Sequence, residues 1–135
     1  MAFVYDNHII LNYGTYLILS MVYLALFTWI YLRFTPYDEI ALIRAGNLAA
    51  AVSLSGALAG FAIPVAIVIA HSVNLVDMAA WTLMATVVQL LVFSVLRKIL
   101  GFVVEDIQAG KVPSALLLAA FSTVAGVLNA ACMTY

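Results

Sequence analysis

Four long apolar segments alternate with short polar connections, and they occupy about residues 13–32, 47–70, 79–96 and 113–134. Each contains roughly 18 to 24 residues, and an α-helix of that length spans a hydrocarbon core of about 30 Å. Backbone polar groups in lipid must pair within their own segment, so all four segments should be helices. The pattern predicts an all-α membrane protein with four transmembrane helices in a single integral membrane domain, residues 1–135.

The composition agrees with this fold class and limits the partners. Hydrophobic residues make up 67% of the chain and charged residues only 8%, whereas a soluble domain carries about 25% charged residues. No basic patch is present, so the expected surroundings are a lipid bilayer and not nucleic acid. Cys132 is the only cysteine, so no intrachain disulfide is possible and its role stays open.

The basic residues predict how the chain crosses the membrane. Two connections between the apolar segments contain all of them: Arg33 and Arg44 in the first, and Arg97, Lys98 and Lys111 in the second. Cytoplasmic loops carry an excess of Lys and Arg, so both connections should be cytoplasmic. Both termini and the loop between the two middle helices are then expected on the outside.

The first basic connection carries signals for a short amphipathic helix on the inner membrane surface. Thr35 is the expected N-cap and Pro36 the first helical residue, with an acidic pair, Asp38 and Glu39, near the positive end of the helix dipole. Gly46 should end this helix. The residue that follows it, an asparagine, can then cap the second transmembrane helix.

The two halves of the chain resemble each other. Arg33 recurs as Arg97, and the Ala-Gly pair at 45–46 recurs at 109–110, both 64 residues further along; the triplet at 38–40 is echoed at 105–107. This similarity predicts two tandem hairpin repeats, about 13–71 and 79–134, in the same orientation across the membrane. Chance similarity between two helices rich in small residues remains the alternative.

Small residues form a stripe on the second and the fourth apolar segments. They are Ala49, Ser53, Gly56 and Gly60 in the second, and Ser122 and Gly126 in the fourth. Such a stripe lets the backbone of another helix approach closely inside a bilayer. These two segments are therefore the expected centre, packed against each other or against another copy of the chain.

No Asp, Glu, Lys or Arg lies inside the four apolar segments, which disfavours a proton-coupled pump. The candidate polar groups are neutral. Pro64 cannot donate a hydrogen bond to the carbonyl of Gly60, Asn129 should lie at a similar depth, and Gln89 lies near the middle of the third segment. These groups serve either as hydrogen bonds between helices or as the lining of a path for ions or water.

The sequence does not favour an enzyme or a metal protein. No catalytic triad, carboxylate pair or phosphate-binding loop is evident. His71, Asp77 and Cys132 should lie near one membrane face, but they have no recognised ligand spacing, and His71 alone is more often a helix cap. We therefore expect no catalytic residues, no metal and no cofactor.

Four runs in the chain carry a family resemblance: Thr35-Pro36 with its acidic pair; Asn47-x-Ala-Ala with the Ser-Gly-x-x-x-Gly helix; Gln89-Leu-Leu-Val-Phe; and Asn129-Ala-Ala-Cys-Met-Thr. With these runs the chain resembles the YjfL-type small inner-membrane proteins (domain of unknown function 350) over nearly its whole length. The resemblance implies a four-helix protein of the bacterial inner membrane and hints at a membrane component of an envelope-stress module. No activity is established for the family, so it assigns no roles; Asn47, Gly60, Pro64, Asn129 and Cys132 are the positions to test first.

Two functional hypotheses follow. The first is a non-enzymatic membrane component that forms homo-oligomers through its small helical faces and docks a cytoplasmic protein on loops 33–46 and 97–112. The alternative is a small oligomeric ion channel or pore lined by neutral polar groups. Both place the chain in the bacterial inner membrane as a multi-pass protein with periplasmic N and C termini.

Overall fold

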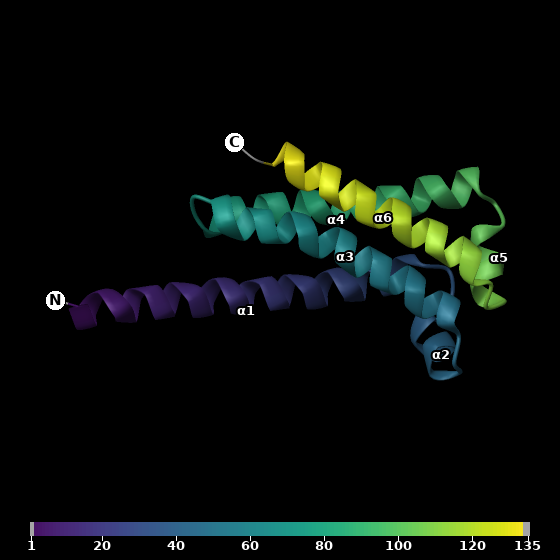
Figure 1. Ribbon diagram of the computed structural model, residues 1–135, viewed down its shortest axis with the longest axis horizontal. Helices are drawn as coiled ribbons and strands as arrows, with labels where there is room; N and C mark the ends of the chain where they lie inside the picture. Colours follow the sequence, from purple (N-terminus) through teal and green to yellow (C-terminus); the bar gives the residue numbers. More distant parts are fainter. Residues whose placement is uncertain (1, 134–135) are drawn as a thin grey trace.

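The computed structural model describes the backbone of residues 2–133 and the side chains of residues 8–133. It contains six helices: α1 (Ala2–Phe34), α2 (Glu39–Arg44), α3 (Leu48–His71), α4 (Leu75–Ile99), α5 (Val103–Gln108) and α6 (Val112–Cys132) (Figure 1). Four stretches are long and apolar enough to cross a membrane: His8–Phe34, Leu48–His71, Leu75–Ile99 and Val112–Cys132. The predicted all-α architecture with four membrane-spanning helices is confirmed, while the end of the last predicted segment, Thr134, lies outside the described residues.

The short helices α2 and α5 lie at the same end of the bundle, and both ends of the described chain lie towards the other end (Figure 1). The five Lys and Arg residues all lie at or next to the helix ends that face α2 and α5. We call this the basic end of the bundle. The connection between α3 and α4 lies at the opposite end.

The bundle has a tight centre and a loosely attached first helix. In the most apolar 18-residue stretch of α3, half of the residues are buried within the chain. In the corresponding stretch of α1, only 11% are buried. The closest packing is between α3 and α6, and α4 lies against both of them. α1 reaches the core mainly through Phe27 and Tyr31, where Phe27 stacks on Phe61 of α3 with ring centroids 4.2 Å apart.

The predicted start of α2 is wrong by one turn. Its N-cap is Asp38, whose Oδ1 accepts a hydrogen bond from the backbone N–H of Ala41 at 3.1 Å. Thr35 instead ends α1, because its N–H donates to the carbonyl of Tyr31 at 3.0 Å and its hydroxyl to that of Leu32 at 3.2 Å. Pro36 disfavours helical geometry at Thr35, so it stops α1 and does not begin α2.

The turns that follow α2 and α5 have the same construction. Gly46 and Gly110 have φ angles of +89° and +80°, in the left-handed region that favours glycine. The next residue donates its N–H back across each turn, Asn47 to Leu42 at 2.9 Å and Lys111 to Asp106 at 2.8 Å. The prediction that Gly46 ends the short helix is confirmed. Asn47 also caps α3 as predicted, since its Oδ1 accepts from the N–H of Ala50 at 3.1 Å.

These matching turns show that the acidic triplets do not occupy equivalent positions. Both turns and both helix starts are separated by 64 residues, so Glu39 corresponds to Val103, and Asp106 corresponds to Leu42. The predicted echo of residues 38–40 at 105–107 is therefore out of register by three residues. The physical consequence is that α2 has a carboxyl group where α5 has a buried valine.

Candidate functional site

The small faces of α3 and α6 meet within the chain. A β-carbon added to Gly56 would collide with the Cα of Ala119, and one added to Gly126 would collide with the carbonyl oxygen of Gly60. The other predicted members of the stripe, Ala49, Ser53 and Ser122, are all buried. The two backbones therefore touch along this line, which leaves none of the stripe for packing against another molecule.

Gln89 of α4 packs against both helices at this contact. Its side chain is 1% exposed, and its Nε2 donates to the carbonyl oxygen of Ser122 at 3.1 Å, while its Oε1 has no hydrogen-bond partner. A β-carbon on Gly60 would lie 2.6 Å from Nε2 and 2.8 Å from Oε1. A side chain at position 60 would therefore collide with the backbone of α6 on one side and with the Gln89 amide on the other.

Asn129 and Pro64 do not join this junction. Pro64 is buried within α3, and the carbonyl of Gly60, four residues before it, faces the backbone of Gly126. Asn129 lies about one turn further along α6, half-buried, and its Nδ2 is buried without a hydrogen-bond partner. The structure therefore brings Gly60 and Gln89 together, and it forms no bond between the amide of Asn129 and the freed carbonyl of Gly60.

The residues weighed as metal ligands are not gathered. Among the residues that the structure describes, no three His, Cys, Asp or Glu side chains lie close enough to hold a metal ion. His71 lies at the end of α3 with its Nδ1 3.0 Å from the carbonyl oxygen of Ile67, so it contacts the last turn of its own helix. Asp77 accepts hydrogen bonds from the N–H of Val73 and the indole of Trp81.

A second site, at the basic end, was missed by the sequence analysis. Glu39 is the first residue of α2, and its side chain is 1% exposed. Both of its carboxyl oxygens are buried without a hydrogen-bond partner, as are the hydroxyl groups of Tyr31 and Tyr37. The Tyr37 hydroxyl lies near both Glu39 and the buried Ser53 of α3. We refer to Tyr31, Tyr37, Glu39 and Ser53 as the Glu39 cluster.

The environment of Glu39 changes its acidity. Burial raises the pKa of the carboxyl to about 7, against a smaller lowering by the nearby Tyr37 hydroxyl. Burial, and after it the charge of Glu39, also hold the pKa of Tyr37 well above its ordinary value. A desolvated carboxyl without a cationic partner favours its neutral form. Glu39 is therefore positioned to gain or lose a proton close to neutral pH.

A cavity of about 590 Å³ lies beside the cluster at the junction of α1 and α2. Its lining includes the buried Glu39 and Tyr37 and the exposed Trp29, Arg33 and Ile40. The guanidinium of Arg33 lies over the Trp29 ring, 5.3 Å from its centroid. Within residues 8–133, Arg33 forms no ion pair, so the only cation bordering the cavity is not bound to Glu39.

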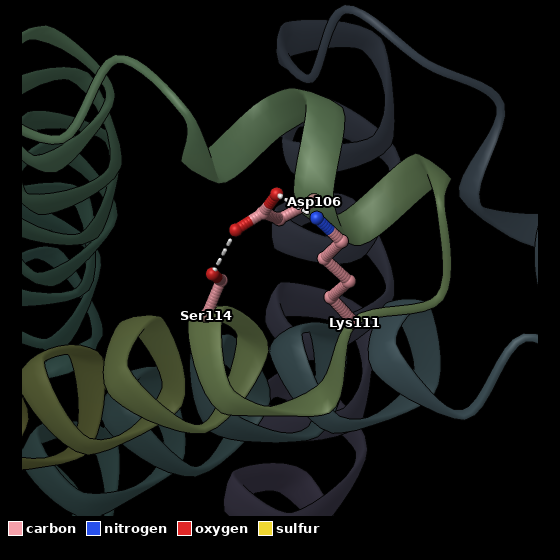
Figure 2. Close-up of polar contacts among 3 residues, drawn as sticks. All are labelled: Asp106, Lys111 and Ser114. Carbon is pink, nitrogen blue, oxygen red and sulfur yellow. Dashed lines mark hydrogen bonds and ion pairs between the residues drawn. The ribbon is translucent and has the colours of Figure 1, made fainter.

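One of the two acidic residues of α5, Asp106, has in contrast both a hydrogen bond and an ion pair. Figure 2 shows Asp106 between two groups: the hydroxyl of Ser114 donates to its Oδ2 at 2.5 Å, and the Nζ of Lys111 lies 3.6 Å from its Oδ1. Ser114 is in the first turn of α6, and Lys111 is its N-cap residue. Asp106 therefore stabilises the connection between α5 and α6 through these two contacts.

One sequence signal could have indicated that Glu39 is buried. Once Asp38 is taken as the N-cap, Glu39 shares a helix face with Leu42 and Ile43, at spacings of three and four residues. Both of those side chains pack against the hydrophobic core. The mistaken N-cap at Thr35 hid this face, because it placed the acidic pair in a solvated first turn.

The fold and these sites define a small helical membrane protein whose polar groups lie in its core and at its basic end. The family model of the Domain of Unknown Function DUF350 matches residues 5–133, and the chain belongs to this family. It is similar to two proteins described as UPF0719 inner membrane protein YjfL, from Escherichia coli strain K12 and from Escherichia coli O157:H7. Each is 32% identical over 126 residues, which cover 93% of this chain and 96% of the relative. No solved structure matches the chain significantly.

Proposed function

We propose that this chain is a non-enzymatic, multi-pass component of the bacterial inner membrane that works as an assembly of several copies. The similarity to proteins described as inner membrane proteins supports the location. The main observation in favour of an assembly is the exposure of α1, since only 11% of its most apolar 18-residue stretch is buried within the chain. The small faces of α3 and α6 are occupied by each other, so copies would associate through α1 instead.

The polarity of α1 supports a protein neighbour on this helix. Asn12 and Thr15 are exposed in its outer half, beside the exposed ring of Tyr13. Lipid tails offer no hydrogen-bond partner to an amide, whereas polar side chains commonly join helices within membranes. A β-carbon on Gly14 would meet nothing within 4 Å, so the chain leaves open space at this point of α1.

Light scattering of the purified protein in mild detergent tests this assembly. Gly14→Leu adds bulk to the proposed interface and should lower the particle mass towards that of a single chain. Gly101→Leu is the matched control, since Gly101 also has nothing within 4 Å but lies between α4 and α5. A monomeric wild-type protein, or equal masses for all three proteins, would exclude association through α1.

We further propose that the chain consists of two tandem hairpin repeats, α1–α2–α3 and α4–α5–α6, with the basic end in the cytoplasm and both termini in the periplasm. The matching turns 64 residues apart support the repeat. The location of all Lys and Arg residues at one end supports the orientation. Cys132, the single exposed cysteine, provides the test. A membrane-impermeant maleimide should label it in intact spheroplasts, whereas a Cys132→Ala, Lys111→Cys variant should be labelled only after lysis.

The basic end is the proposed docking surface for a cytoplasmic protein, in line with the envelope-stress module that the family resemblance implies. Exposed charged side chains from both halves gather there, among them Arg44, Lys98 and Glu105. Photo-crosslinking residues placed at Arg44 and Lys98 should capture the same partner in cells. The matched control is Val76 at the opposite end, which is exposed and should capture nothing in common with them. Identical capture from both ends would contradict the proposal.

An ion or water path remains a second candidate because the Oε1 of Gln89 and the Nδ2 of Asn129 are buried without partners. The direct contact of Gly60 with Gly126 fills the space between α3 and α6, so such a path would have to pass between copies of the chain. Planar-bilayer recordings of the purified assembly would show a conductance that Asn129→Leu reduces. No conductance, or a conductance that the substitution leaves unchanged, excludes this role.

A further inference from the structure

Glu39 carries the one buried acidic group among the described residues, and neither the proposed assembly nor the packing of α3 on α6 uses it. An ionised carboxylate buried without a cation is strongly unfavourable, because no surrounding group replaces its hydration. The side chain must therefore be neutral, acquire a partner, or leave the core. The geometry around it decides which of these is available.

Among residues 8–133, no Lys or Arg side chain forms an ion pair with the Glu39 carboxyl. α1 contributes the buried Tyr31, and its Arg33, which also borders the cavity, lies over Trp29. The connection before α2 contributes Tyr37 and Asp38, and the Asp38 carboxylate is engaged with the N–H of Ala41. α3 contributes only the hydroxyl of Ser53, which donates to its own helix at the Ala50 carbonyl.

The side chains that α4 and α5 place beside this cluster, Phe93 and Gln108, are uncharged. Phe93 of α4 packs edge-on against the Tyr31 ring, with centroids 5.8 Å apart. Gln108 of α5 borders a smaller cavity that Tyr37 and Leu42 also line. Hydroxyl groups can share a proton with a neutral carboxyl, but they cannot balance a full negative charge in a desolvated site.

We propose that Glu39 is a proton-binding site that controls the position of α2: with the proton bound, the carboxyl stays in the core and α2 is held against α3. When the proton passes to water at the basic end, the carboxylate moves into the adjoining cavity, towards the guanidinium of Arg33. α2 then loosens from the bundle. Because α2 lies within loop 33–46, the proton would control the surface that the basic end presents.

The construction of α2 permits this movement. A helix of six residues has no stability of its own, so its attachment depends on the side chains that it buries. These are Glu39 itself and the partly buried Leu42 and Ile43. The cavity already lies beside Glu39, so the carboxylate needs only a local shift to reach water. The Glu39 pKa of about 7 places the transition close to neutral pH.

A direct measurement follows the carboxyl carbons by NMR. The chain has two glutamates, Glu39 and Glu105, so protein labelled with ¹³C at the glutamate carboxyl should give two resonances, of which Glu39→Gln removes one. The Glu39 resonance should titrate with a midpoint near pH 7 in the full chain in detergent micelles. A midpoint close to the ordinary carboxyl value of 4.5 would overturn the proposal.

Hydrogen exchange then tests whether this proton controls α2. After correction for intrinsic rates, the amides of Glu39–Arg44 should exchange up to tenfold faster for each pH unit between about pH 4.5 and the midpoint near pH 7, because opening releases the proton that the closed form still holds there. The acceleration should level off above the midpoint, where the closed form is already deprotonated. Glu39→Gln keeps the shape of the neutral acid, so α2 should stay protected at every pH. Asp106→Asn, the matched acid on α5, should behave like the wild type. A wild-type α2 whose protection matches that of Glu39→Gln across the titration would overturn the control of α2, even with a raised midpoint.

Discussion

α2 and α5 occupy corresponding places in the two halves of the chain, and both end in a glycine turn with the same hydrogen bonds. They differ in the buried side chain at their first position. In α5 this residue is Val103, an ordinary member of the core, and the nearby acid Asp106 pairs with Ser114 and Lys111 (Figure 2). In α2 it is Glu39, a carboxyl buried with no partner.

This difference separates a structural acid from a candidate functional one. α5 begins with a buried valine at the corresponding position, so a short helix of this kind can begin without a carboxyl in the core. A buried, unpaired carboxyl lowers stability when it is ionised. The basic end therefore has a buried, unpaired carboxyl in α2 and none in α5.

The largest effect is expected from a substitution that separates the two halves. Gly60→Leu would drive a side chain into the Ser122 carbonyl and the Gln89 amide, which backbone contacts prevent from moving away. We expect a loss of more than about 4 kcal/mol in the free energy of unfolding, or no folded protein at all. Thermal unfolding in mild detergent measures it, with Gly101→Leu as the control. An unfolding temperature close to that of the wild type would show that the halves do not meet at Gly60.

The next effect is the pH dependence that distinguishes α2 from α5. The pKa of Glu39 is raised from 4.5 in the unfolded chain to about 7 in the fold. Its contribution to stability is therefore complete below about pH 4.5, decreases as the pH rises, and is lost above about pH 7. The shift corresponds to about 3 kcal/mol in the free energy of unfolding. Glu39→Gln should remove this slope, and Asp106→Asn should leave it in place; equal slopes in all three proteins would refute the difference between the two acids.

A smaller effect is expected at the bond that connects the two short helices. Asn47 caps α3 through its Oδ1, and its Nδ2 donates to the carbonyl of Ile107 at the end of α5 at 2.8 Å. Asn47→Ala removes both bonds and should cost about 2 kcal/mol. Asn47→Asp keeps the cap but loses the donor, so it should retain about half of that stability. Chemical denaturation of the two variants measures the difference, and equal losses would show that the bond to Ile107 contributes nothing.

The smallest effect is expected for the partnered acid of α5. Lys111 is two-thirds exposed, so its pairing with Asp106 is screened by solvent. Asp106→Asn should lower the free energy of unfolding by less than about 1 kcal/mol. The loss should diminish at high salt if the ion pair with Lys111 contributes to it. A loss as large as that caused by Gly60→Leu would place Asp106 among the essential core contacts and weaken its contrast with Glu39.

Local rules predicted much of this protein correctly. The four membrane helices, the end of α2 at Gly46 and the cap of α3 at Asn47 all follow from hydrophobic length and from turn and capping chemistry, which act within a few residues. The prediction that failed locally, the N-cap at Thr35, arose because Thr35 and Asp38 are both good caps. Pro36 decides between them by ending α1.

Glu39 could not be recognised in the same way. By sequence it lies in a polar connection outside all four apolar segments, and an acidic residue in the first turn of a helix is ordinarily solvated. It is buried where Tyr31, Tyr37 and Ser53, from three separate segments, come together. Their approach depends on how the end of α1 packs against α3 and α4, and the periodicity of a single segment does not contain that information.

The sequence by itself determined that the chain is helical, that four helices can span a membrane and that the small residues of α3 and α6 permit close approach, because hydropathy, capping and side-chain size are properties of single segments. The tertiary structure decided that the small faces meet within one chain and that one acid, Glu39, enters the core while Asp106 finds partners. Those outcomes depend on which surfaces are brought together in space, and on the charge and hydrogen bonds available to each group once it is there.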